Sequence, residues 1–147
     1  HILNEAIDPV YPATLSFSTL AQRLRKELRY NRLIITDDMQ MDAVAKHFGE
    51  EDMIALAINA SCDILLYRTE EKGRRAMDIA FKFLKEGRIS AENVEAAYQR
   101  IKEVKERMLM PYQAPKLEDL SIIGCDQHVE VLQMVTEKRK PAGSELD

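Results

Sequence analysis

The sequence predicts an α/β fold, and two apolar runs with helical segments around them carry that prediction. The first run, Leu33–Thr36, leads directly into the carboxylates Asp37 and Asp38, and the second spans Cys62–Tyr67. Continuous apolar runs of this length are typical of parallel strands that are covered on both faces. Ligands and catalytic groups in such folds gather at the carboxyl ends of the strands, where the two aspartates lie.

Composition excludes several other classes of protein. The chain has 147 residues, of which 46% are hydrophobic and 31% charged, and these are globular values. The formal net charge of -4 gives no reason to expect nucleic acid or an anionic membrane as a partner. Cys62 and Cys125 match no metal-binding spacing, so we expect two reduced thiols, the first of them buried in a strand.

The start of the chain carries no targeting signal. The first residue is His1 rather than Met, and no segment resembles a signal peptide or an apolar run long enough to span a membrane. We therefore expect the natural N-terminus to be missing, no membrane span, and a cytoplasmic location.

The segment before the first strand predicts one amphipathic helix. Residues 1–15 are irregular, and Ser16 is a good N-cap for a helix that reaches about Leu28. Leucines at positions 20, 24 and 28 mark its apolar face. Arg25 and the neighbouring basic residues lie off that face, so we expect them to be solvated.

Between the two strands the pattern predicts two helices. Asp37 or Asp38 can cap a helix from Ala43 to about Phe48, and Gly49 is the expected left-handed stop. A second helix should begin in the acidic turn at positions 50–52.

After the second strand the pattern predicts a helix from 70 to 86 closed by Gly87, and another that Ser90 caps and Pro111 ends. We place a domain boundary here: residues 1–110 form one partial domain, and 111–147 form a linker, a terminal helix capped by Asp126 and a polar tail that frays from Thr136. Two strands joined by one crossover leave open sheet edges, so we expect further polypeptide or an oligomer to cover them.

The acidic pair allows four interpretations from the residues alone. Both aspartates could cap the following helix. Asp37 could be a covalent nucleophile on a rigid strand end, as in retaining glycoside hydrolysis. Asp37, Asp38 and Asp42 could bind Mg²⁺ through oxygen ligands. Finally, Asp37 could accept a phosphoryl group, since the stretch superficially resembles response-regulator receiver domains, although the upstream acidic pair and the Pro-Gly turn of those domains are absent.

Several segments resemble the last third of the catalytic domain of glycoside hydrolase family 3, and most closely its bacterial β-N-acetylhexosaminidases. The resemblance covers about residues 1–110, and the Thr-Asp-Asp-Met-x-Met motif is fairly specific. The segments are Pro12–Ser16, Leu24–Leu28, Ile34–Met41, Ala60–Leu66, Gly87–Ser90 and Arg100–Lys105.

The resemblance implies the C-terminal portion of a (β/α)₈ TIM-type barrel with additional C-terminal helices. Asp37 would be the nucleophile at the end of the seventh strand of a retaining enzyme. Asp38, Met39 and Met41 would support or border the sugar pocket, and neither cofactor nor metal is expected. His1 matches a residue that the family often has near the end of strand six, although a histidine at a chain end is more often flexible.

This chain departs from the family pattern in two respects. It has Arg29 and Arg32 where members often have glycines before the seventh strand. The general acid/base of the subfamily is an aspartate-histidine pair on an upstream loop, and no such loop occurs here, so we expect this chain alone to be inactive.

The predicted function is hydrolysis of terminal N-acetyl-β-glucosaminides, with cell-wall amino sugars as the implied substrate class. One alternative is a β-glucosidase of the same family, although that branch usually has an aromatic residue where this chain has Asp38. The other is a non-catalytic α/β interaction module or a degenerate fragment in which Asp37 is only a cap.

Overall fold

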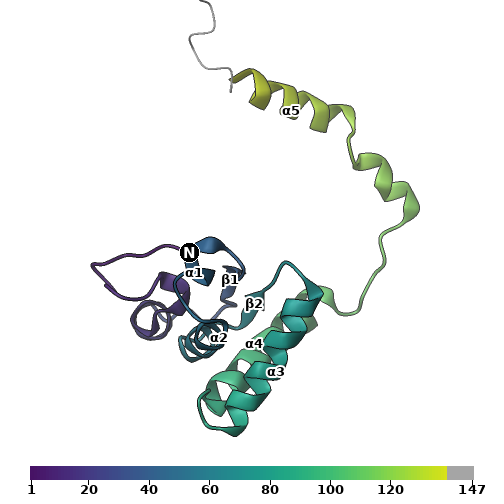
Figure 1. The fold of residues 1–147 in the computed structure, drawn as a ribbon. Helices are drawn as coiled ribbons and strands as arrows, with labels where there is room; N and C mark the ends of the chain where they lie inside the picture. Colours follow the sequence, from purple (N-terminus) through teal and green to yellow (C-terminus); the bar gives the residue numbers. More distant parts are fainter. Residues whose placement is uncertain (139–147) are drawn as a thin grey trace, which may run out of the picture. The chain divides into compact units, whose positions relative to one another are not determined.

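Two parallel strands, β1 (Ile35–Asp38) and β2 (Ile64–Leu66), lie side by side in the first part of the chain (Figure 1). The computed structural model describes residues 1–138, with one unit ending at Met110 and a second starting at Pro111. Helices connect β1 to β2, which makes one parallel βαβ unit. The predicted α/β class is confirmed.

The sheet is covered on one face rather than on two. Thr36 is buried at 4% exposure, and Leu65 packs against the helical core. Ile35 and Leu66, in contrast, are 51% and 45% exposed. Among the described residues the strands are therefore covered on one face only, and these residues supply no cover for the other face.

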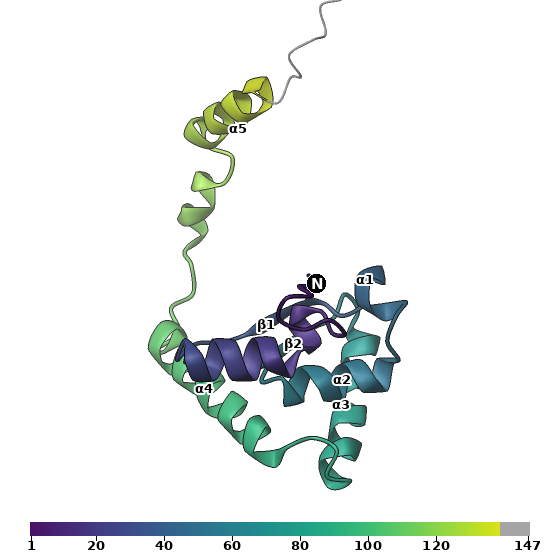
Figure 2. The same cartoon turned by 90° about the vertical axis from the view of Figure 1, so that its left-hand side faces the viewer.

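The helices that cover one face of the sheet form two apolar clusters, and α2 contributes residues to both. One cluster centres on Leu15, Met39 and Val44, and the other on Ile54 and Phe83. Figure 2 shows α3 and α4 in the view turned by 90°. In order, the helical elements of this unit are η1 (Ala13–Leu15), η2 (Ser18–Glu27), α1 (Asp42–Ala45), α2 (Glu50–Asn59), α3 (Glu70–Lys85) and α4 (Ala91–Leu109).

The helix predicted from Ser16 to Leu28 is a π-helix, η2, and its wider turn changes which residues face inward. Its backbone is hydrogen-bonded from residue i to i+5, as from Leu28 N to Arg23 O at 2.9 Å. Residue i+5 then lies nearer to residue i than in an α-helix, so Arg25 shares a side with buried Leu20. The Arg25 side chain is 12% exposed, and the prediction that it is solvated is wrong.

The connection between β1 and α2 differs from the prediction at both of its helix ends. Helix α1 is a single turn that begins at Asp42, and its N-cap Met41 makes no side-chain capping bond. The prediction that Asp37 or Asp38 caps this helix is therefore wrong. Gly49 has φ -63° and ψ 145° and is the N-cap of α2, so it is not a left-handed stop.

The predicted ends of α3 and α4 are largely confirmed. Thr69 caps α3 by accepting a hydrogen bond from Lys72 N at 3.4 Å. Gly87 follows α3 with φ 72°, a left-handed conformation that favours glycine. Ser90 caps α4 by accepting from Asn93 N at 3.2 Å.

Arg29 leads from η2 toward β1 in a left-handed conformation, with φ 54°. A non-glycine residue pays about 1–2 kcal/mol there, because its Cβ approaches the following carbonyl oxygen. We expect Arg29→Gly to raise the free energy of unfolding by about 0.5–1 kcal/mol after the extra freedom of the unfolded chain is counted. Urea unfolding followed by circular dichroism measures this. Lys26→Gly inside η2 is the matched control and should lower stability; a lower stability for Arg29→Gly as well would contradict the explanation.

The second unit contains η3 (Leu117–Ile122) and α5 (Asp126–Lys138). The predicted linker 111–125 therefore includes a 3₁₀ helix, and the predicted helix at Asp126 is present. The chain from Thr136 is helical up to the end of α5, and the rest of the predicted tail, 139–147, lies outside the described residues. Among the described helices, none is long and apolar enough to cross a membrane.

Candidate active site at the end of β1

A β-bulge lies where β1 reaches its carboxyl end. Ile35 pairs with Ile64 and Asp38 pairs with Leu66, so β1 advances three residues while β2 advances two. The extra residue falls within Thr36–Asp37. Bulges are over-represented next to active sites, where they turn a side chain away from the regular pleat. Leu66 N donates to the Thr36 side-chain hydroxyl at 2.9 Å, so a side chain replaces a backbone partner at the bulge.

Asp37 carries the exposed carboxylate of this site. Its side chain is 58% exposed, and its Oδ2 lies 3.8 Å from the backbone nitrogen of His1. Its Oδ1 accepts a hydrogen bond from Asp38 N at 2.8 Å. One carboxylate oxygen is therefore held by the backbone, and the side chain as a whole remains exposed.

Asp38 is bound through all of its polar groups. Its N–H donates to Asp37, and its carbonyl lies 3.0 Å from the His1 Nε2. Its Oδ1 accepts from Gln40 N at 2.9 Å, and its Oδ2 accepts from Arg68 Nε at 2.8 Å. The Gln40 N–H and the Arg68 guanidinium hold the pKa of the Asp38 carboxyl below its ordinary value. Asp38 therefore orders the chain around Asp37.

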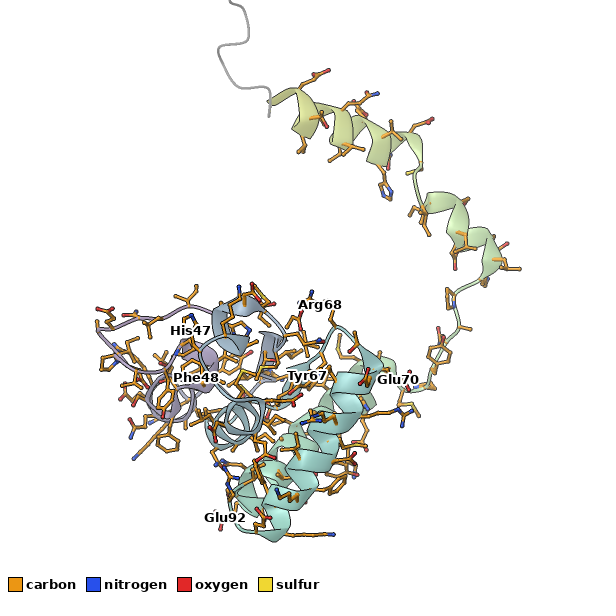
Figure 3. The ribbon with its side chains drawn as sticks, viewed as in Figure 1. His47, Phe48, Tyr67, Arg68, Glu70 and Glu92 are labelled. Atoms are coloured by element: carbon orange, nitrogen blue, oxygen red, sulfur yellow. The ribbon has the colours of Figure 1, made fainter. Side chains whose placement is uncertain are left out.

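Gln40 joins the turn after β1 to the turn after β2. Its Oε1 accepts hydrogen bonds from Arg68 N at 2.9 Å and from Thr69 N at 3.2 Å. Figure 3 shows Arg68 beside Tyr67 where the chain leaves β2 and approaches α3 at Glu70. Gln40 and Arg68 could not be found from the sequence, because both are ordinary loop residues whose partners lie about 30 positions away along the chain.

The two methionines of the motif lie at different depths. Met39 is 1% exposed and belongs to the core cluster with Leu15 and Val44, so it anchors the turn after β1 to the core. Its N–H donates to Leu66 O at 2.9 Å, which continues the pairing of the strands. Met41 is 38% exposed and lies just before α1.

The three acids that suggested a magnesium site do not converge. Asp42 lies in α1 and pairs with Lys46 at 2.6 Å, whereas Asp38 pairs with Arg68 at 2.8 Å. Among residues 1–138, no group of three or more acidic, histidine or cysteine side chains is arranged to hold a metal ion.

The opposite end of the sheet holds a buried ionic cluster. The Asp63 side chain is 0% exposed and accepts from Arg25 Nη2 at 2.6 Å and from Arg100 Nε at 2.8 Å. It also accepts from Ile34 N at 2.7 Å. Arg25 further donates to both the hydroxyl and the carbonyl of Ser61 at 3.1 Å. This cluster therefore ties η2 and α4 to the starts of both strands, and it is a stabilising element far from Asp37.

Cys62 lies beside this cluster and is protected from reaction. Burial raises the pKa of the Cys62 thiol to about 12, and both cysteines are free thiols. Cys62 is buried, as predicted, but it precedes β2 and does not lie in the strand. Because the thiolate is the reactive form, we expect Cys62 to be modified by a disulfide reagent at pH 8 only after denaturant is added. Cys125, which is partly exposed, should react without denaturant. Mass spectrometry of the labelled peptides checks this; fast labelling of Cys62 in the folded protein would contradict it.

A parallel strand that presents a carboxylate at its carboxyl end, followed by helices, is the unit from which (β/α)₈ enzymes are built. The chain belongs to glycoside hydrolase family 3: the profile of the Glycosyl hydrolase family 3 N terminal domain matches residues 1–104. The described strands and helices of the first unit therefore form a portion of a TIM-type barrel. This assignment gives no support to the phosphoacceptor interpretation.

Individual proteins and solved structures are also similar to this chain. The chain is 33% identical over 120 residues to a β-hexosaminidase of Idiomarina loihiensis, covering 82% of this chain and 32% of that protein. It is similar to the structure of a β-N-acetylglucosaminidase of the same family from Paenibacillus sp. str. FPU-7, with TM-score 0.77 and 30% identity, covering 94% and 27% of the two chains. A β-glucoside phosphorylase, BglX, has TM-score 0.75 at 20% identity over 90% and 25% of the chains, which is a likeness of fold alone. The chain thus spans about a third of its curated relative.

Proposed function

We propose that this chain supplies the nucleophile of a retaining exo-β-N-acetylhexosaminidase whose barrel is completed by further polypeptide. The observation that carries the proposal is the exposed Asp37 carboxylate, held by Asp38 N–H at a bulge on the carboxyl end of a parallel strand. The named relatives of this chain, a β-hexosaminidase and a β-N-acetylglucosaminidase, support the substrate class.

The proposed chemistry has two displacements. Asp37 Oδ2 attacks the anomeric carbon from the face opposite the leaving group, while an acid from the rest of the barrel protonates the departing oxygen. Water then attacks the resulting glycosyl ester, and the same acid, now a base, takes its proton. The sugar is released with its original β configuration and Asp37 is restored.

The rest of the barrel has two tasks in this proposal. It provides the general acid/base, and it covers the open face of the sheet, where Ile35 and Leu66 are about half exposed. Without those walls Asp37 has no enclosed sugar pocket, so the chain alone is proposed to be inactive. The cytoplasmic location predicted from the sequence remains a prediction.

Turnover of chromogenic substrates by the completed enzyme tests the proposal. We expect a nitrophenyl N-acetyl-β-glucosaminide to be preferred over the matching β-glucoside by about 10²-fold in kcat/KM, because a site built to bind a polar substituent discriminates against its absence. A preference for the glucoside would instead favour the β-glucosidase alternative. No turnover of either substrate by the folded enzyme would favour the non-catalytic module.

A further inference from the structure

Three hydrogen bonds around Asp37 together fix the bulge. Leu66 N–H in β2 donates to the Thr36 hydroxyl at 2.9 Å, just before Asp37. Met39 N–H donates to Leu66 O at 2.9 Å, after Asp37. The peptide between Asp38 and Met39 is also engaged at its carbonyl, which lies 3.0 Å from His1 Nε2. The segment that carries Asp37 is thus restrained at both of its ends.

His1 is part of this restraint rather than a flexible terminus. His1 is partly buried, and its Nδ1 lies 2.9 Å from the Thr14 hydroxyl. With Nε2–H donating to the Asp38 carbonyl, Nδ1 accepts from Thr14, and both ring nitrogens are used. Partly buried hydrogen bonds of this kind hold geometry more firmly than fully exposed ones, because water competes less for the partners.

We propose that Thr36 and His1 are positioning residues for Asp37: they fix the bulged segment before and after Asp37 along the chain, so that Asp38 N–H points at Asp37 Oδ1 and the other carboxylate oxygen faces the substrate. This inference rests on the proposed function. Neither side chain contacts the reacting atoms, and both act through the backbone on either side of Asp37. A nucleophile misplaced by about 1 Å can lose about 10²-fold in rate.

Thr36 offers an isosteric test in the completed enzyme. Thr36→Val keeps the shape of the buried side chain and removes the hydroxyl, which leaves Leu66 N–H without its partner. We expect kcat to fall by about 10- to 100-fold with little change in KM. Thr36→Ser restores the hydroxyl and should recover the rate to within about threefold of the wild-type value.

Titration of active sites separates positioning from simple loss of fold. A fluorinated glycosyl fluoride that traps the glycosyl-enzyme counts the competent sites in each preparation. Positioning predicts a lower kcat per titrated site in Thr36→Val. A purely structural role would lower the number of titrated sites and leave kcat per site unchanged, and that result would overturn the inference.

His1 gives a second, independent test. His1→Phe removes both ring nitrogens, and we expect kcat per titrated site to fall by about tenfold or more. His47→Phe is the matched control, because His47 is exposed in the turn that follows α1 (Figure 3). An unchanged rate for both Thr36→Val and His1→Phe, in an enzyme that Asp37→Ala inactivates, would refute this inference alone. Normal activity of Asp37→Ala would refute the proposed function.

Discussion

Replacing Asp37 by Ala in the completed enzyme should reduce kcat on an N-acetyl-β-glucosaminide by at least about 10³-fold. The reason is chemical: without a carboxylate at the end of β1, no covalent intermediate can form and water must attack directly. The fold should not suffer, because the Asp37 side chain is 58% exposed and its one hydrogen bond is to the adjacent backbone N–H. Steady-state kinetics of the wild type and Asp37→Ala measure the loss of kcat. An unchanged unfolding midpoint shows that the variant is folded.

Asp42→Ala is the matched control for Asp37→Ala. Asp42 lies five positions further on in α1 and pairs with Lys46 at the surface. Its removal should leave kcat within about twofold of the wild-type value, since an exposed pair contributes little.

Azide adds a positive test of the Asp37→Ala variant. If Asp37 is the nucleophile, azide entering the space left in Asp37→Ala should attack the same carbon and yield the α-glycosyl azide. Wild-type activity of Asp37→Ala would contradict the assignment of Asp37 as the nucleophile.

Replacing Asp63 by Ala should cause the largest loss of stability of any single carboxylate substitution in the first unit. It should lower the free energy of unfolding by about 3–5 kcal/mol, because Arg25 and Arg100 would remain as largely buried charges without their counter-ion. Ile34 N–H would also lose its acceptor. Urea unfolding followed by circular dichroism measures the loss, and a variant already unfolded in water would agree with it.

Two further variants define the origin of that loss. Asp63→Asn keeps the shape and some hydrogen-bonding capacity but removes the charge, so its stability should fall between those of Asp63→Ala and the wild type. Asp78→Ala, in the exposed part of α3, is the matched control and should change stability by about 0.5 kcal/mol or less. An Asp63→Ala protein as stable as Asp78→Ala would show that the cluster does not hold the fold together.

The position of Asp37 could be predicted from the sequence, whereas its supports could not. An apolar run that ends in an acid defines a strand and its carboxyl end, and both are present. The bulge cannot be read from β1 alone, because it is a mismatch of register with β2. One signal was available: Thr36 is a polar residue in an apolar run, and a buried hydroxyl needs a partner.

The errors of the sequence analysis share a physical cause. Leucine spacing in the helix before β1 fits an α-helix, but the backbone forms i to i+5 bonds and turns Arg25 toward Asp63. Gly49 could equally end one helix or begin another. The acidic turn that follows it favours the beginning of a helix, and Gly49 is the N-cap of α2. In both cases other residues override the preference inferred from a single pattern: the distant Asp63 for Arg25, and the adjacent acidic turn for Gly49.

The most direct test of the account is to trap the covalent intermediate. A fluorinated N-acetylglucosaminyl fluoride forms the glycosyl-enzyme quickly, because fluoride is an excellent leaving group. The glycosyl-enzyme then hydrolyses slowly, because the fluorine on the sugar ring destabilises the oxocarbenium-like transition state. Peptide mass spectrometry of the trapped enzyme should place the sugar on Asp37. A sugar on any other residue, or none in an enzyme that is turning over substrate, would contradict the central claim that the bulge at the end of β1 presents the nucleophile.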